Sequence, residues 1–140
     1  MEVVVIVVVA LAVGLGAVAA LLFVLLRVLS RASADKGEQV RRAFPDAVAG
    51  PELGQYRGGT GGFPRTRNTS WIVLTPHALA VRPIWGTAIS LPVADITGTR
   101  VQNSFNTYRN GQPVLVVETA TGELGLTVAD PAAWELALAR

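Results

Sequence analysis

Three arginines lie near one another in the sequence, around a glycine-rich stretch, and their type points to anion binding. Arg57, Arg65 and Arg67 fall between Tyr56 and Asn68, with no acidic residue among them. The planar guanidinium group of arginine matches the oxygens of a phosphate in bidentate geometry. The segment therefore indicates a site for a phosphate-bearing anion. The plainer interpretation, a solvated rim, is favoured by the sequence, because arginines on loops are commonly just exposed.

The side chains that usually perform catalysis are scarce in this chain. It has no cysteine, which excludes thiol catalysis, thiolate metal sites and disulfides. Its one histidine, His77, follows Pro76 in a predicted turn, and no second histidine exists to build a metal site. The glycine run of residues 58–62 lacks the lysine of a phosphate loop, and no serine lies in a nucleophile elbow. We therefore predict that the protein is not an enzyme and holds no metal or cofactor.

Residues 3–26 form an uninterrupted apolar run that predicts a transmembrane helix. At 1.5 Å per residue such a helix is about 36 Å long, enough to cross a hydrocarbon core of about 30 Å. The alternative is a cleaved signal peptide, because Ala32-Ser33-Ala34 has the small residues of a cleavage site. The run is longer than a signal peptide's apolar region, and Glu2 stands where a basic segment is expected. We therefore predict an uncleaved single-pass anchor.

The basic residues predict how this anchor is oriented. Five of them follow it closely and none precedes it: Arg27, Arg31, Lys36, Arg41 and Arg42. Since basic residues accumulate on the cytoplasmic side, we predict a plasma-membrane protein with the tail of residues 1–2 outside and the remainder in the cytoplasm. Ala12, Gly16 and Ala20 share one face of the helix, which would suit a homodimer. Small residues are common in membrane helices, so the favoured interpretation is that this face reflects ordinary composition and does not mediate dimerisation.

Residues 27–52 are predicted to be a charged juxtamembrane linker. They carry five basic and four acidic side chains, a net charge of +1, followed by proline and glycine that end the segment near residue 52. Within it, residues 35–44 are expected to form a short helix with Val40 and Phe44 on one face. A basic segment can contact anionic headgroups, but the low net charge favours a solvated linker.

Residues 53–140 change to short β-branched runs separated by turns, a pattern typical of antiparallel strands. Asn110-Gly111 and Thr121-Gly122 supply the positive φ angles that the last two reversals need. A closing helix is expected from Asp130 as N-cap, with Trp134 and Leu138 on one face. This pattern predicts a mainly β fold, a seven-stranded antiparallel barrel capped by a C-terminal helix. The predicted strands lie near residues 55–60, 70–75, 79–83, 88–91, 96–103, 113–119 and 124–128.

This region resembles a known family. The stretch from Trp71 to Arg82, WIVLTPHALAVR, is similar to the leucine-threonine, turn, leucine-x-x-arginine hairpin of bacterial PH-like and GRAM-type domains. Ile89, Leu91 and Ile96 follow with the spacing of their next hairpin. An anchor joined to such a domain is similar to small actinobacterial membrane proteins of unknown function. The resemblance covers residues 53–140 and implies a PH-like barrel that binds lipid headgroups, peptides or proteins and is generally not catalytic.

The resemblance extends to the arginines. A cation, seven residues and then Arg-x-Arg, as in Arg57, Arg65 and Arg67, resembles the headgroup-binding loop of phosphoinositide-type PH domains. Two departures are Arg57 in place of lysine and Thr69 in place of an apolar residue. Trp85 lies at the tip of the next hairpin, which points the same way in a meander, and suits an interfacial anchor. The alternative is that Trp85 folds back onto the barrel.

Two functions follow from these observations. We predict a non-catalytic binding or scaffold module that recognises an unknown protein or peptide partner at the cytoplasmic face of the membrane. The alternative is binding of anionic lipid headgroups through Arg57, Arg65 and Arg67, with Trp85 as anchor. Nucleic acid is not expected as a partner, because residues 53–140 carry seven cations against five anions and no basic stripe.

Overall fold

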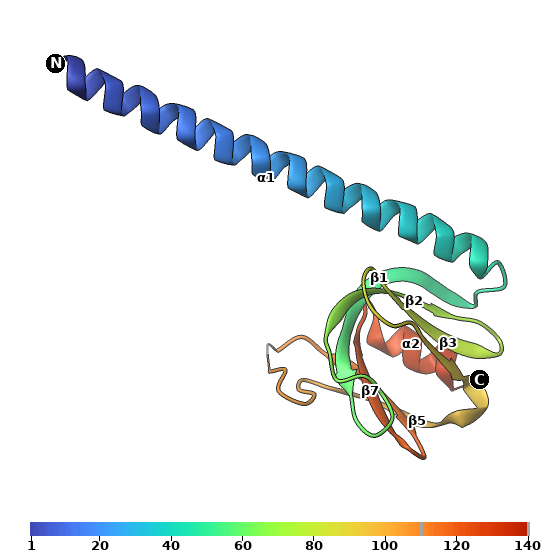
Figure 1. Cartoon of the computed structure of the whole chain (residues 1–140). Helices are drawn as coiled ribbons and strands as arrows, with labels where there is room; N and C mark the ends of the chain where they lie inside the picture. Colours follow the sequence, from blue (N-terminus) through green and yellow to red (C-terminus); the bar gives the residue numbers. More distant parts are fainter. Residues whose placement is uncertain (110, 140) are drawn as a thin grey trace. The chain divides into compact units, whose positions relative to one another are not determined.

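The computed structural model describes residues 1–109 and 111–139, so the predicted turn residue Asn110 lies outside the described residues. The chain forms two compact units, Met1–Asp35 and Lys36–Arg140. Helix α1 (Glu2–Ala43) begins in the first unit and ends in the second. The sheet and helix α2 belong to the second unit (Figure 1).

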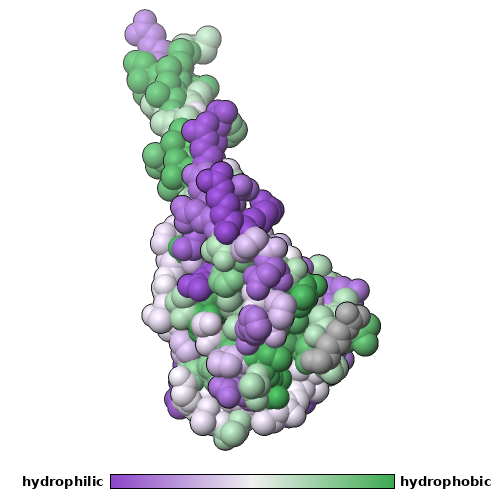
Figure 2. Space-filling view, turned by 90° about the vertical axis from the view of Figure 1, so that its right-hand side faces the viewer, coloured by the Kyte–Doolittle hydropathy of each residue, from purple (hydrophilic) through white to green (hydrophobic). Residues whose placement is uncertain are grey.

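The first unit is the apolar part of α1. Its large apolar side chains, from Val3 to Leu29, are exposed along the helix, and Figure 2 shows them as a green surface followed by purple, charged side chains. Within the described residues, α1 is the one helix long and apolar enough to cross a membrane. It contains the predicted span of residues 3–26.

The second unit contains the predicted seven strands and terminal helix, joined into one antiparallel sheet. The strand order is β4-β3-β2-β1-β7-β6-β5, so β1 lies between its sequence neighbour β2 and the last strand, β7 (Figure 1). The elements are β1 (Ala49–Gly59), β2 (Asn68–Leu74), β3 (Ala78–Pro83), β4 (Ile89–Pro92), the 3-10 turn η1 (Val93–Asp95), β5 (Ile96–Gln102), β6 (Val114–Thr119), β7 (Gly122–Thr127) and α2 (Pro131–Leu138).

The sheet is not closed into the predicted barrel. Strands β4 and β5 form its two edges, and among the described residues no ladder of hydrogen bonds joins them. β4 has only four residues and ends at Pro92, which has no backbone N–H to donate. The next three residues form η1 instead of extending the strand. The sequence pattern predicts the number of strands. Whether the sheet closes into a barrel depends on the corner formed by Pro92 and η1, between β4 and β5.

The segment 27–52, predicted as a charged linker, is mostly helix and strand in the structure. α1 continues to Ala43, as the short predicted helix implied, and β1 begins at Ala49 instead of near residue 55. The end of α1 packs on the outer face of β2 and β3, where Val40 is only 3% exposed beside Trp71. Gly37 permits this approach, because a Cβ there would collide with the Trp71 ring.

The main core lies between the inner face of the sheet and α2. Asp130 caps α2 by accepting a hydrogen bond from the Ala133 N–H at 3.1 Å, as predicted. The indole N–H of Trp134 donates to the carboxylate of Glu52, which ties α2 to β1. The buried apolar side chains of this core are Tyr56, Ile72, Leu74, Leu79, Val81, Leu91, Leu115, Val117, Leu124, Leu126, Val128, Trp134 and Leu138.

Arg100 of β5 links the last three strands through an ion-pair network. Its guanidinium pairs with Glu118 of β6 and, at 2.9 Å, with Glu123 of β7. The hydrogen bond from Arg100 lowers the pKa of Glu123 below its usual range. Glu118 and Glu123, which show no functional spacing in the sequence, therefore both pair with Arg100, and this network joins the three strands.

This network predicts a pH dependence of stability. Because the pKa of Glu123 is lower in the folded state, its stabilising effect is present at neutral pH and is lost as the pH falls through that folded pKa. We expect the Tm of the unaltered protein to fall more than that of Glu123→Gln between about pH 6 and pH 3. Circular dichroism melts over this range measure the difference, and parallel curves for the two proteins would contradict it.

Candidate functional site

The structure brings the three predicted arginines together in one surface depression of ≈ 300 Å³. Arg57 comes from β1, and Arg65 and Arg67 come from the loop between β1 and β2. None of the described residues that line it is acidic. We call it the arginine depression, and it is lined by Arg57, Gly59, Thr60, Arg65, Arg67, Asn106 and Thr107.

Arg57 is the most constrained of the three cations. It is half-buried, and its guanidinium carbon lies 3.8 Å from the centroid of the Tyr108 ring. Its Nε donates a hydrogen bond to the Thr127 hydroxyl at 2.8 Å. The ring and the threonine therefore fix the guanidinium plane, and the cation–π contact partly offsets the cost of desolvating it.

Arg65 and Arg67 are both exposed, and they differ from Arg57 in how firmly they are held. Arg67 donates a hydrogen bond from Nη2 to the hydroxyl of Thr107, which lies on the loop between β5 and β6. Two cations that face solvent beside a fixed third one form a positively charged surface that an anion can reach without rearranging the sheet.

The shape of the β1–β2 loop depends on two residues of β1. Tyr56 is buried, and its hydroxyl donates to the carbonyl of Pro64 at 2.7 Å, which ties the loop to the strand. Burial raises the pKa of Tyr56 to about 12, so the donating proton stays in place even in moderately alkaline solution. Gly58 has φ of +90°, and a Cβ there would lie 2.9 Å from the Arg65 carbonyl oxygen. The loop therefore approaches β1 closely.

Tyr56→Phe tests this positioning without changing any charge. Without the hydroxyl, the Pro64 carbonyl loses its partner, at a cost to stability of about 1 kcal/mol. We expect a lower urea midpoint and anion binding weakened several-fold, because Arg65 is less well placed. Tyr108→Phe is the control, since that hydroxyl makes only a 3.4 Å contact with Gln112. Equal effects of the two substitutions would contradict the prediction.

The β5–β6 loop supplies two of the seven residues that line the depression, Asn106 and Thr107, and local sequence patterns do not predict its part in the site. Phe105 and Tyr108 are buried against the outer face of β6 and β7 and exchange two backbone hydrogen bonds, of 3.1 and 2.9 Å. Asn106 and Thr107 therefore form the tip of the loop, and Asn106 has a positive φ of 53°. Two aromatic residues three positions apart in a polar loop were the only local signal.

Trp85 lies outside the arginine depression. It is 68% exposed in the turn between β3 and β4. This turn is a neighbour of the β1–β2 loop, because Ile84 donates its backbone N–H to the Thr69 carbonyl at 3.1 Å. The structure therefore places the predicted tryptophan on a separate element, in a turn that is hydrogen-bonded to the start of β2.

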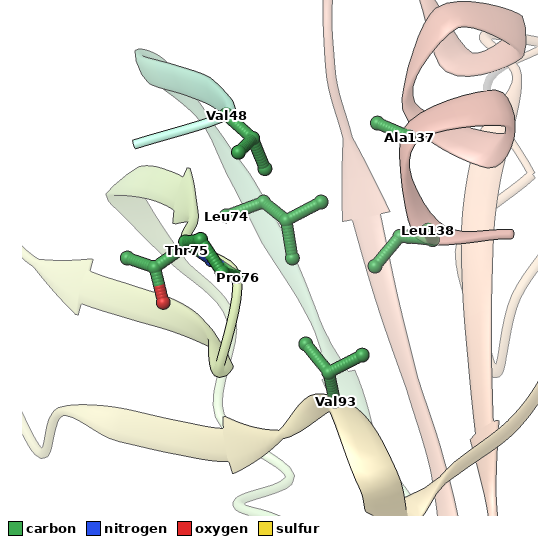
Figure 3. Close-up of a pocket in the computed structure, with 7 residues that line it drawn as sticks. All are labelled: Val48, Leu74, Thr75, Pro76, Val93, Ala137 and Leu138. Carbon is green, nitrogen blue, oxygen red and sulfur yellow. The ribbon is translucent and has the colours of Figure 1, made fainter. Parts of the chain in front are cut away.

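A second cavity, the apolar pocket of ≈ 280 Å³, lies where α2 ends. Figure 3 shows the side chains of Val48, Leu74, Val93 and Leu138 directed toward one shared space. None of its described lining residues is charged, so it suits an apolar group. Local sequence patterns do not predict it, since its lining residues come from four separate stretches of the chain: Val48, Leu74, Thr75, Pro76, Val93, Ala137 and Leu138.

The small residues Ala12, Gly16 and Ala20 lie on α1 in the first unit and are exposed. No Cβ contact would form at Gly16 within the described chain. The predicted homodimer face is thus open along the helix.

No protein-family model matches the chain, and no curated protein matches it either. The likeness of residues 53–140 to PH-like and GRAM-type domains therefore remains a prediction, whereas the seven-stranded antiparallel sheet followed by a helix is observed.

Proposed function

We propose that the second unit is a PH-like module that binds phosphate-bearing headgroups of anionic lipids through the arginine depression. The observation that carries the proposal is the convergence of Arg57, Arg65 and Arg67 on one surface, with no acidic side chain among the described lining residues. Arginine offers forked donors to phosphate oxygens, and Asn106 and Thr107 add neutral polar groups beside them. The geometry favours this function over the solvated rim that the sequence alone favoured.

A lipid headgroup is favoured over a free anion for two reasons. The same chain contains a helix long and apolar enough to cross a membrane, and a tethered domain meets headgroups at high effective concentration. Trp85, exposed in the turn beside the β1–β2 loop, is a side chain that prefers the interface between water and lipid. In this proposal the module lies on the cytoplasmic side of the plasma membrane and is not catalytic.

The test uses the full chain held in nanodiscs of phosphatidylcholine and mixed with separate vesicles. We expect co-sedimentation with vesicles rich in phosphatidylglycerol, weakened by salt, and none with vesicles of phosphatidylcholine alone. Glycerol phosphate added at increasing concentration distinguishes the two sources of phosphate. Weak competition supports a lipid surface, whereas full displacement at low concentration indicates a site for a free phosphate ester. Equal binding to both kinds of vesicle would contradict the proposal.

Recognition of a protein partner is our second proposal, and the apolar pocket is the observation that favours it. Its lining would accept one apolar side chain of a partner peptide, next to the exposed Leu136 of α2. Ala137→Met, which extends into the pocket, would then weaken partner binding and leave vesicle binding unchanged. Arg65→Gln would have the opposite effects, so the two proposals are separable.

A further inference from the structure

We propose that Thr107 is a phosphorylation site whose phosphate occupies the arginine depression from within the same chain and excludes a headgroup. The inference rests on the proposed function, because it adds regulation to the same site. It starts from one contact: the hydroxyl that would carry the phosphate already accepts a hydrogen bond from Arg67. The anion would therefore be formed next to its binding groups.

Thr107 is better placed for this role than the other hydroxyl that lines the depression. The side chain of Thr107 is exposed at the loop tip, where a modifying enzyme can reach it. Thr60, in contrast, accepts the backbone N–H of Glu123 at 3.0 Å and helps to connect β1 to β7. A phosphate on Thr60 would break this hydrogen bond. A phosphate on Thr107 would instead replace a hydroxyl that already accepts a hydrogen bond from Arg67.

The loop holds Thr107 in position before any modification. Phe105 and Tyr108 flank the tip, are both buried, and exchange two backbone hydrogen bonds. Tyr108 also lies under the guanidinium of Arg57, so the base of the loop is attached to the site itself. Little further conformational entropy is lost when a phosphate on the tip binds the arginines.

The charges of the depression complement a phosphate monoester. Phosphorylation adds a charge of about −1.5 to −2 at neutral pH. Three arginines face it, and none of the lining residues that the structure describes is acidic. Charge-assisted hydrogen bonds from Arg65 and Arg67 would replace the neutral contact that Thr107 now makes. The depression would then lose about half to two thirds of its positive charge, and its affinity for headgroups would fall.

The modification itself is an ordinary phosphoryl transfer. A protein kinase, supplied in trans, catalyses attack of the Thr107 Oγ on the γ-phosphorus of ATP. The bond between that phosphorus and the bridging oxygen breaks, ADP leaves, and the hydroxyl proton passes to a base of the kinase. A phosphatase, adding water to the same ester, would reverse the modification.

The first experiment installs phosphothreonine at residue 107 of the full chain during translation, with the protein held in phosphatidylcholine nanodiscs. The control carries phosphothreonine at Thr97, an exposed residue of β5 outside the depression. We expect phosphorus NMR to give a second phosphate pKa at least about one unit lower at residue 107 than at residue 97. Arg67→Gln should remove most of that difference. Equal values at the two positions would overturn the proposal.

Vesicle binding separates failure of this inference from failure of the proposed function. We expect the protein phosphorylated at residue 107 to lose at least about tenfold in affinity for phosphatidylglycerol vesicles, relative to the Thr97 control. If both bind equally, the inference fails and headgroup binding stands. If the unmodified chain binds no vesicle while the phosphate pKa still falls, headgroup binding fails and the phosphate site stands. Mass spectrometry of the protein from its own cells should find phosphate on Thr107, and its absence in every growth phase would overturn the switch.

Discussion

Replacing Arg65 and Arg67 together by glutamate is expected to lower the affinity for phosphatidylglycerol vesicles at least a hundredfold. Each cation near an anionic surface contributes about 1 kcal/mol, and the double substitution removes two cations and adds two anions. A change of about 4 kcal/mol exceeds the hundredfold loss that a sedimentation assay can readily measure. Both side chains are exposed, so the fold and its melting temperature should be nearly unchanged.

A matched variant shows whether position or net charge is responsible. Arg41→Glu with Arg42→Glu changes the net charge by the same amount at side chains that are 56% and 79% exposed, away from the arginine depression. We expect this variant to keep most of its binding. If both double variants lose affinity equally, the arginine depression is not the binding site and general attraction explains the result.

A fragment of residues 36–140 is expected to fold, whereas a fragment of residues 53–140 is not. The shorter one begins at the domain boundary predicted from the sequence, but it lacks Val40, whose burial alone is worth about 1.5–3 kcal/mol. It also loses Glu52, which accepts from Trp134 and from the Ala129 N–H, and the hydrogen bond from the Val48 N–H to the Leu74 carbonyl at 2.7 Å. A domain with about 5–15 kcal/mol of total stability cannot lose all of these contacts and stay folded.

Urea unfolding followed by tryptophan fluorescence measures the difference between the fragments. Residues 36–140 should give one cooperative transition, and residues 53–140 a broad one or none. Gly37→Leu in the longer fragment is the informative variant, because its side chain would push the helix end away from Trp71. We expect it to expose that ring and lower the urea midpoint. Equal stability of the two fragments would show that the end of α1 is dispensable.

Local signals explain what the sequence could predict. β-Branched runs separated by turn residues give the approximate positions of β2 to β7, and Asp130 with Pro131 gives the start of α2. Val40 and Phe44, four residues apart, indicate the apolar face of the helix end. These features depend on residues within a few positions of one another, and the structure agrees with them closely.

The features that the sequence could not predict depend on distant contacts. The early start of β1 was hidden because Gly50 and Pro51 look like linker residues, although Ala49 pairs with Leu74 of β2. The open edge of the sheet follows from the corner at η1. Asn106 and Thr107 reach the arginines because their loop folds back over β6 and β7. The spacing of residues within the loop does not predict this packing.

The central position of β1 has a consequence for synthesis on the ribosome. β1 pairs early with β2, but its other edge waits for β7, and Arg57 is 70 residues from its partner Thr127. At about 5–20 residues per second, that interval lasts about 4–14 s. Throughout it, the nascent chain presents the unpaired edge of β1 that β7 will later cover, and such an edge is a template for pairing with another nascent copy. Ribosomes that pause between β4 and β6 should therefore increase misassembly between neighbouring chains, and arrival of β7 is the event that ends this risk.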